Sequence, residues 1–185
     1  MHEIGVVHGR FQVLHHDHMK YVLAARERCR HLVIGITNPD PTLTKEDPTN
    51  PERSRPEHNP FTYFERYTMV KAALSEAGIS HRDFSVVPLP INFPELYRYY
   101  VPPAAVFFLT VYDDWGRRKL AWLRELGFKT EVLWERPPAE KGLTGTEVRR
   151  RLAEGLSWRE LVPPAVAEVI QDLGLVERLA GSKDR

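Results

Sequence analysis

Short apolar runs alternate with segments of helical periodicity along most of the chain. The apolar runs are rich in β-branched residues and are bounded by glycine, proline or charged residues, which is typical of buried strands. They lie at residues 4–7, 31–37, 84–89, 106–111 and 129–134. Helical patterns occupy residues 17–30, 60–77 and 115–126, and further helical pieces follow residue 146, broken at Gly155 and at Pro163-Pro164.

The order of these elements predicts the fold class. Strands separated by helices pair in parallel through right-handed crossovers, so we expect a doubly wound α/β fold. Its core is a Rossmann-like, five-stranded parallel sheet, followed by a helical C-terminal tail. A chain of 185 residues corresponds to one domain, which we assign to residues 1–180, with 181–185 as a flexible tail. The segment 38–60, rich in proline, threonine and charge, is expected to be a long loop and a candidate lid.

Composition and charge narrow the class of protein. Lys and Arg number 26 against 25 Asp and Glu, a net charge of +1, which lacks the basic excess of a general nucleic-acid binder. Cys29 is the single cysteine, so neither an intramolecular disulfide nor a cysteine-based zinc site is expected. No apolar stretch approaches the roughly 18 residues of a membrane span. We therefore expect a cytoplasmic protein with no membrane or nucleic-acid partner.

The strongest candidate chemistry follows the first predicted strand, because ligands of such sheets bind beyond the carboxyl ends of the strands. The segment reads Gly9-Arg10-Phe11-Gln12-Val13-Leu14-His15-His16-Asp17-His18. A glycine turn and the helix start behind it present unpaired N–H groups to an anion. Arg10 adds a bidentate donor, and His15 and His18 can face the same phosphate. A zinc site lacks a third ligand other than Asp17, which we expect to cap the helix, so no metal site is predicted.

A second anion-binding pattern follows the fifth predicted strand. It reads Leu143-Thr144-Gly145-Thr146-Glu147-Val148-Arg149 and again opens a helix. In position and order the two segments resemble the nucleotidyltransferase superfamily, with its motifs G-x-F-x-P-x-H-x-G-H and I-S-x-T-x-x-R. Together with Asn59-Pro60-Phe61-Thr62, they make the chain similar to the archaeal type of nicotinamide mononucleotide adenylyltransferase.

This resemblance implies in-line transfer of a nucleotidyl group from a nucleoside triphosphate to a phosphate-bearing acceptor, with release of pyrophosphate. The catalytic residues that it implies are His15, His18, Arg10 and Arg149. The nucleotide-binding residues that it implies are Gly9, Phe11, Gln12, Thr144, Gly145 and Thr146. Mg²⁺ is expected as a cofactor bound mainly through the triphosphate, and a homo-oligomer is expected.

Acceptor recognition is where the chain departs from the resemblance. Tyr97 stands where the archaeal enzymes have a tryptophan that stacks on the pyridine ring, and tyrosine also stacks. Asn59, Asp113 and Trp115 are further substrate-binding candidates. The simpler interpretation of the tract 113–119 is a helix cap followed by a solvated face that includes Lys119. The other tryptophans, at 122 and 134, are expected in the core.

Three functions remain open. ATP with nicotinamide mononucleotide is the leading substrate pair. A CTP-dependent cytidylyltransferase acting on a small phosphate or phosphonate metabolite is the close alternative. Asp17 replaces the family's glycine and Val13 its proline, and the carboxylate of Asp17 makes a nucleotide-binding regulator without turnover conceivable.

Overall fold

The computed structural model describes residues 1–46 and 51–181, and it has the expected α/β fold. Its sheet has five strands in the order β3-β2-β1-β4-β5, and all neighbouring strands pair in parallel. The strands are β1 (His2–Gly9), β2 (Cys29–Ile36), β3 (Phe84–Pro88), β4 (Val106–Val111) and β5 (Lys129–Glu135). The strand order reverses between β1 and β4, so the carboxyl ends of these two strands flank the crevice in which such sheets bind ligands.

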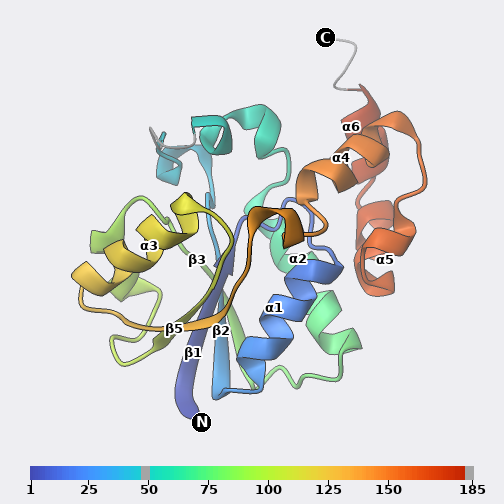
Figure 1. The fold of residues 1–185 in the computed structure, drawn as a ribbon. Coiled ribbons are helices and arrows are strands. Elements are labelled where there is room, and N and C mark those ends of the chain that lie inside the picture. The colour runs from blue at the N-terminus through green and yellow to red at the C-terminus, as the bar shows by residue number, and fades with distance from the viewer. Residues whose placement is uncertain (47–50, 182–185) are drawn as a thin grey trace.

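Helices cover both faces of the sheet, with α3 on one side and α1 and α2 on the other, while α4, α5 and α6 lie beyond α2 (Figure 1). Their bounds are α1 (His16–Arg26), α2 (Tyr63–Glu76), α3 (Asp114–Glu125), α4 (Gly145–Glu154), α5 (Pro164–Asp172) and α6 (Leu175–Gly181). The helical tail is thus present, and Gly155 ends α4 in the left-handed conformation. The tail expected at 181–185 lies outside the described residues from 182 onward. No described helix is long and apolar enough to cross a membrane.

Two apolar clusters hold these layers together. The larger cluster joins the sheet to α1, α2, α4, α5 and α6, and the smaller one lies under α3 and the 3-10 helix η4 (Pro94–Tyr99). Trp122 packs against the smaller cluster, as expected. Most buried strand positions hold apolar residues, with valine and isoleucine prominent among them, because the sheet is covered on both faces.

The long loop after β2 is anchored at its beginning by one buried arginine of α2. Arg66 is 1% exposed and donates hydrogen bonds to the carbonyl oxygens of Thr37, Asn38, Pro39 and Arg10. The loop carries the 3-10 helices η1 (Pro41–Leu43), η2 (Pro51–Ser54) and η3 (Pro56–His58). Residues 47–50 of the expected lid lie outside the described part of the chain, and closure over a bound nucleotide stays a prediction.

Candidate active site

A cleft of about 450 Å³ opens at the carboxyl ends of β1 and β4. The first turns of α1, α3 and α4 all line it, together with the loop after β1, so the positive ends of these helix dipoles meet there. Its basic lining residues are Arg10, Arg53, Lys119, Lys141 and Arg149. This surface suits a ligand with several negative charges.

Arg10 shows how strongly the cleft concentrates positive charge. Its guanidinium donates to the carbonyl oxygen of His58 at 3.1 Å. Burial, together with the charges of Arg53, Arg149 and Arg66, lowers its pKa to about 9. The side chain is still protonated at neutral pH, and a bound polyphosphate would relieve this mutual repulsion.

His15 and His18 meet at the start of α1. Their rings stack with centroids 3.7 Å apart, and Nδ1 of His15 accepts a hydrogen bond from the backbone N–H of His18 at 3.4 Å. An accepting Nδ1 leaves the proton of the neutral ring on Nε2, where it can be donated to a ligand. Burial lowers the pKa of His15 to about 4 and holds that of His18 well below its usual value. Both rings are therefore neutral at pH 7, with one N–H each.

The helix cap differs from the sequence-based expectation. His15, and not Asp17, is the N-cap of α1. Asp17 lies in the first turn, where its carboxylate accepts the N–H of Leu143 at 2.6 Å and pairs with Lys20. Gly142 is in the left-handed region with a φ of 72°, and a β-carbon there would collide with Asp17. Asp17, at the position where the motif has glycine, thus joins the loop before α4 to helix α1 by a hydrogen bond.

The second motif packs directly on the first. Arg149 is 8% exposed and donates to the carbonyl oxygen of Gln12 and, at 3.3 Å, to Oγ1 of Thr146. Thr144 caps α4 through the N–H of residue 147. A β-carbon on Gly145 would lie 2.6 Å from the same Gln12 oxygen, so only glycine allows this close approach. Two segments more than a hundred residues apart in sequence therefore form one site.

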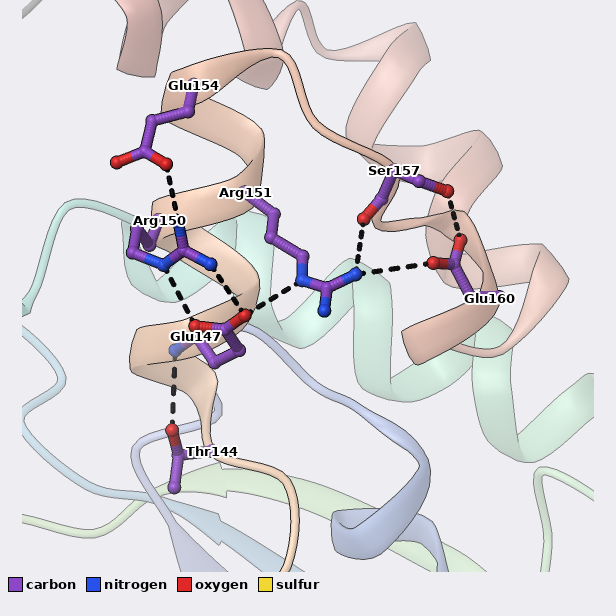
Figure 2. A network of polar contacts seen from close by, with 7 residues as sticks. All are labelled: Thr144, Glu147, Arg150, Arg151, Glu154, Ser157 and Glu160. Atoms are coloured by element: carbon purple, nitrogen blue, oxygen red, sulfur yellow. Dashed lines mark hydrogen bonds and ion pairs between the residues drawn. The ribbon is translucent and has the colours of Figure 1, made fainter.

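The arginines that follow Arg149 face elsewhere. Figure 2 shows Arg150 and Arg151 in a network of ion pairs around Glu147. Arg151 also donates to the carbonyl oxygen of Ser157 at 2.9 Å. Of this run of three, Arg149 alone is among the residues that line the described cleft, in agreement with the sequence-based choice.

Phe11 and Gln12 shape the site from within the protein. Phe11 is 1% exposed, and its ring meets that of His18 edge-on with centroids 5.1 Å apart. The Gln12 amide donates to the carbonyl oxygen of Phe61 at 3.0 Å and accepts its N–H at 2.9 Å. These hydrogen bonds of the Gln12 side chain join the first loop to the loop before α2. Gly9, Phe11 and Gln12 all line the cleft, and their binding of a nucleotide stays a prediction.

Two acceptor candidates are placed away from the cleft. Tyr97 is 0% exposed, its hydroxyl donates to the carbonyl oxygen of Ile91, and its ring lies among those of Phe107 and Trp122. The expectation that Tyr97 stacks on a substrate ring is therefore wrong, because the apolar core covers it. Asn59 donates to the carbonyl oxygens of residues 53 and 55 and is not among the cleft residues. It organises the loop instead.

The tract at the start of α3 does belong to the cleft. Asp113 caps α3 through the N–H of Gly116 at 2.9 Å and pairs with Lys141. The Trp115 ring contacts two cations, the Arg53 guanidinium at 4.5 Å and the Lys119 ammonium at 4.4 Å from its centroid.

Three cleft residues are placed differently from the sequence-based expectation or were not anticipated by it. Lys119 was expected on a solvated face, yet it is half-buried and lines the cleft. Trp134 was expected in the core, yet it also lines the cleft and donates to the hydroxyl of Tyr112. His8 was missed. The signal available for it was a polar residue near the end of an otherwise apolar strand.

The fold and this paired-motif site define a nucleotidyltransferase. The chain belongs to the cytidylyltransferase-like family, whose model matches residues 6–151. A phosphonoformate cytidylyltransferase of Streptomyces viridochromogenes is 54% identical over 175 residues, which are 95% of this chain and 94% of that protein. Nicotinamide-nucleotide adenylyltransferases of Thermococcus kodakarensis and Pyrococcus furiosus are each 35% identical, over 95% of this chain and 86% of theirs.

A solved structure supports the fold. The bifunctional NMN adenylyltransferase/ADP ribose pyrophosphatase from Francisella tularensis superposes with a TM-score of 0.72 at 17% identity. The superposition covers 100% of this chain and 54% of that one, so the chain spans about half of its length.

Proposed function

We propose that this protein is a CTP-dependent cytidylyltransferase that acts on a small phosphonate or phosphate acceptor. The observation that carries the proposal is the 54% identity, over nearly the whole of both chains, with a phosphonoformate cytidylyltransferase. The nicotinamide-nucleotide enzymes reach 35%. The burial of Tyr97 also supports this choice over our leading expectation of ATP and nicotinamide mononucleotide, because the expected stacking ring is not exposed.

The proposed reaction needs positioning and charge stabilisation more than covalent help from the protein. An oxygen of the acceptor phosphonate attacks the α-phosphorus of CTP, the bond to the β-phosphate oxygen breaks, and pyrophosphate leaves. His15 and His18 donate to the α-phosphate through their neutral rings. Arg10 and Arg149 hold the β- and γ-phosphates, with the α4 start at Thr146 adding donors.

We propose that Mg²⁺ arrives on the triphosphate. No group of three or more His, Cys, Asp or Glu suited to a metal occurs within residues 1–46 and 51–181. Phosphate and water oxygens, which Mg²⁺ prefers, would supply most of its ligands. When bound, the ion neutralises phosphate charge.

Pyrophosphate release across the four nucleoside triphosphates, each with phosphonoformate or nicotinamide mononucleotide, tests this function. We expect the highest kcat/KM with CTP and phosphonoformate, together with a CMP conjugate of the acceptor. A higher kcat/KM with ATP and nicotinamide mononucleotide would refute the proposal. Binding of CTP without pyrophosphate from any pair would instead favour a regulator.

A further inference from the structure

A small recess of about 50 Å³ adjoins the cleft between the end of β1, the loop after β2 and α3. His8 lines both the recess and the cleft and is 7% exposed. Neither of its ring nitrogens has a hydrogen-bond partner among the described residues. A buried polar group without a partner costs free energy. An imidazole in this state at a recess therefore points to a ligand that supplies the missing hydrogen bond.

The charge around His8 indicates the sign of that ligand. Lys119 and Arg53 also line the recess, and both rest on the Trp115 ring. No Asp or Glu is among the described residues that line it. Burial and the charges of Lys119 and Arg53 keep the pKa of His8 well below its usual value. The ring is therefore neutral and has one N–H to donate, next to two cations that favour an anion.

The size of the recess limits the anionic group. A water molecule needs about 10 to 15 Å³ of such a cavity, so 50 Å³ accommodates a few non-hydrogen atoms. A carboxylate, with three non-hydrogen atoms, fits this space, whereas a nucleoside with its base does not. The neighbouring cleft is large enough for the nucleotide and for the reacting phosphonate.

We propose that the recess binds a carboxylate of the acceptor through His8 and Lys119, while the phosphonate of the same molecule faces the nucleotide in the cleft. This inference rests on the proposed function and names its acceptor class, a compact molecule with two anionic groups. His8 donates its ring N–H to one carboxylate oxygen, and Lys119 supplies the opposing charge. The two residues determine specificity by binding substrate.

Two acceptors that differ only in the carboxylate test the inference. Phosphonoformate carries it, and methylphosphonate replaces it with a methyl group. For each variant we would measure the ratio of kcat/KM for phosphonoformate to that for methylphosphonate, with CTP saturating. His8→Leu and Lys119→Met should each lower this ratio by about 10- to 100-fold, the range of a hydrogen bond to a charged group. Arg118→Met, which removes an exposed charge from the same helix, should leave the ratio unchanged.

The failures of the two proposals are distinguishable. An active wild-type protein whose ratio does not change in His8→Leu and Lys119→Met would overturn the carboxylate site alone. A wild-type protein that releases no pyrophosphate would overturn the proposed function. The recess is then tested by binding, because phosphonoformate should raise the Tm of the wild type more than methylphosphonate does, and His8→Leu should abolish that difference. Equal shifts for both compounds in the wild type would overturn the inference.

Folding of the variant is checked by the same melting curves. Leucine fills the space of the imidazole without burying an unpartnered nitrogen, so the unliganded His8→Leu protein should melt no lower than the wild type. A lower Tm would show that His8 also stabilises the fold. In that case His8→Asn, which retains a hydrogen-bond donor, should restore part of the ratio of kcat/KM values for the two acceptors. Failure of His8→Asn to recover any of it would count against the carboxylate contact.

Discussion

Lys119 should make acceptor binding depend on pH above neutrality. Burial in the cleft and the charge of Arg53 lower its pKa to about 7, against a partial opposing effect of Asp113 and with a further contribution from Lys141. The free protein therefore loses this positive charge as the pH rises through 7. An anionic acceptor binds the protonated form, so its affinity is full well below pH 7 and declines as the pH rises through 7.

The magnitude follows from the position of the pKa. With a pKa of about 7, half of the lysines are protonated at pH 7 and about one in a hundred at pH 9, so the KM for phosphonoformate should rise by up to about 50-fold between these values. His8 does not titrate in this range, because its pKa lies well below the usual value. Phosphonate and triphosphate groups become more negative with rising pH. That change would strengthen their binding to cations and lower KM, which is opposite to the effect expected from the deprotonation of Lys119.

The assay is steady-state pyrophosphate release at saturating CTP from pH 6 to 9.5, with KM and kcat for phosphonoformate separated. Lys119→Arg is the matched control, since a guanidinium keeps its charge across the whole range. Its KM should vary far less with pH than that of the wild type. A wild-type KM that stays constant between pH 7 and 9, or an identical slope in Lys119→Arg, would refute the reasoning.

Three further predictions test the rest of the site. His18→Ala should lower kcat by about 10²- to 10³-fold through loss of a preorganised donor, while the affinity for the triphosphate changes much less. His16→Ala, which removes an exposed histidine of the same helix, is its control. A decrease in kcat of less than threefold for His18→Ala would contradict the assignment. Arg149→Ala should raise the KM for the triphosphate, whereas Arg151→Ala, which removes pairs outside the cleft, should do little; equal effects would indicate a general basic patch. Gln12→Met should lower the free energy of unfolding by about 2 to 6 kcal/mol in urea denaturation, because it leaves the buried N–H and carbonyl of Phe61 unpaired. A change under 1 kcal/mol would show that the two hydrogen bonds between Gln12 and Phe61 contribute little to stability.

The strands, the helices and the two segments proposed to bind phosphate could be predicted from the sequence. Hydrophobic periodicity is a local property, and the capping of α4 by Thr144 is also set by neighbouring residues. Parallel pairing then follows from the order of the elements, which brings both motifs to the carboxyl edge of the sheet.

The tertiary structure alone decided which side chains face the cleft. Tyr97 and Lys119 were assigned by their place in the sequence, yet the 3-10 helix η4 turns Tyr97 into the core and α3 places Lys119 against Trp115. The same holds for His8, whose lack of a hydrogen-bond partner depends on elements far along the chain. Local pattern fixes which segments become strands and helices, because it acts over a few residues. Burial, charge and hydrogen bonding at the site arise between distant segments, so they emerge only when the fold brings those segments together.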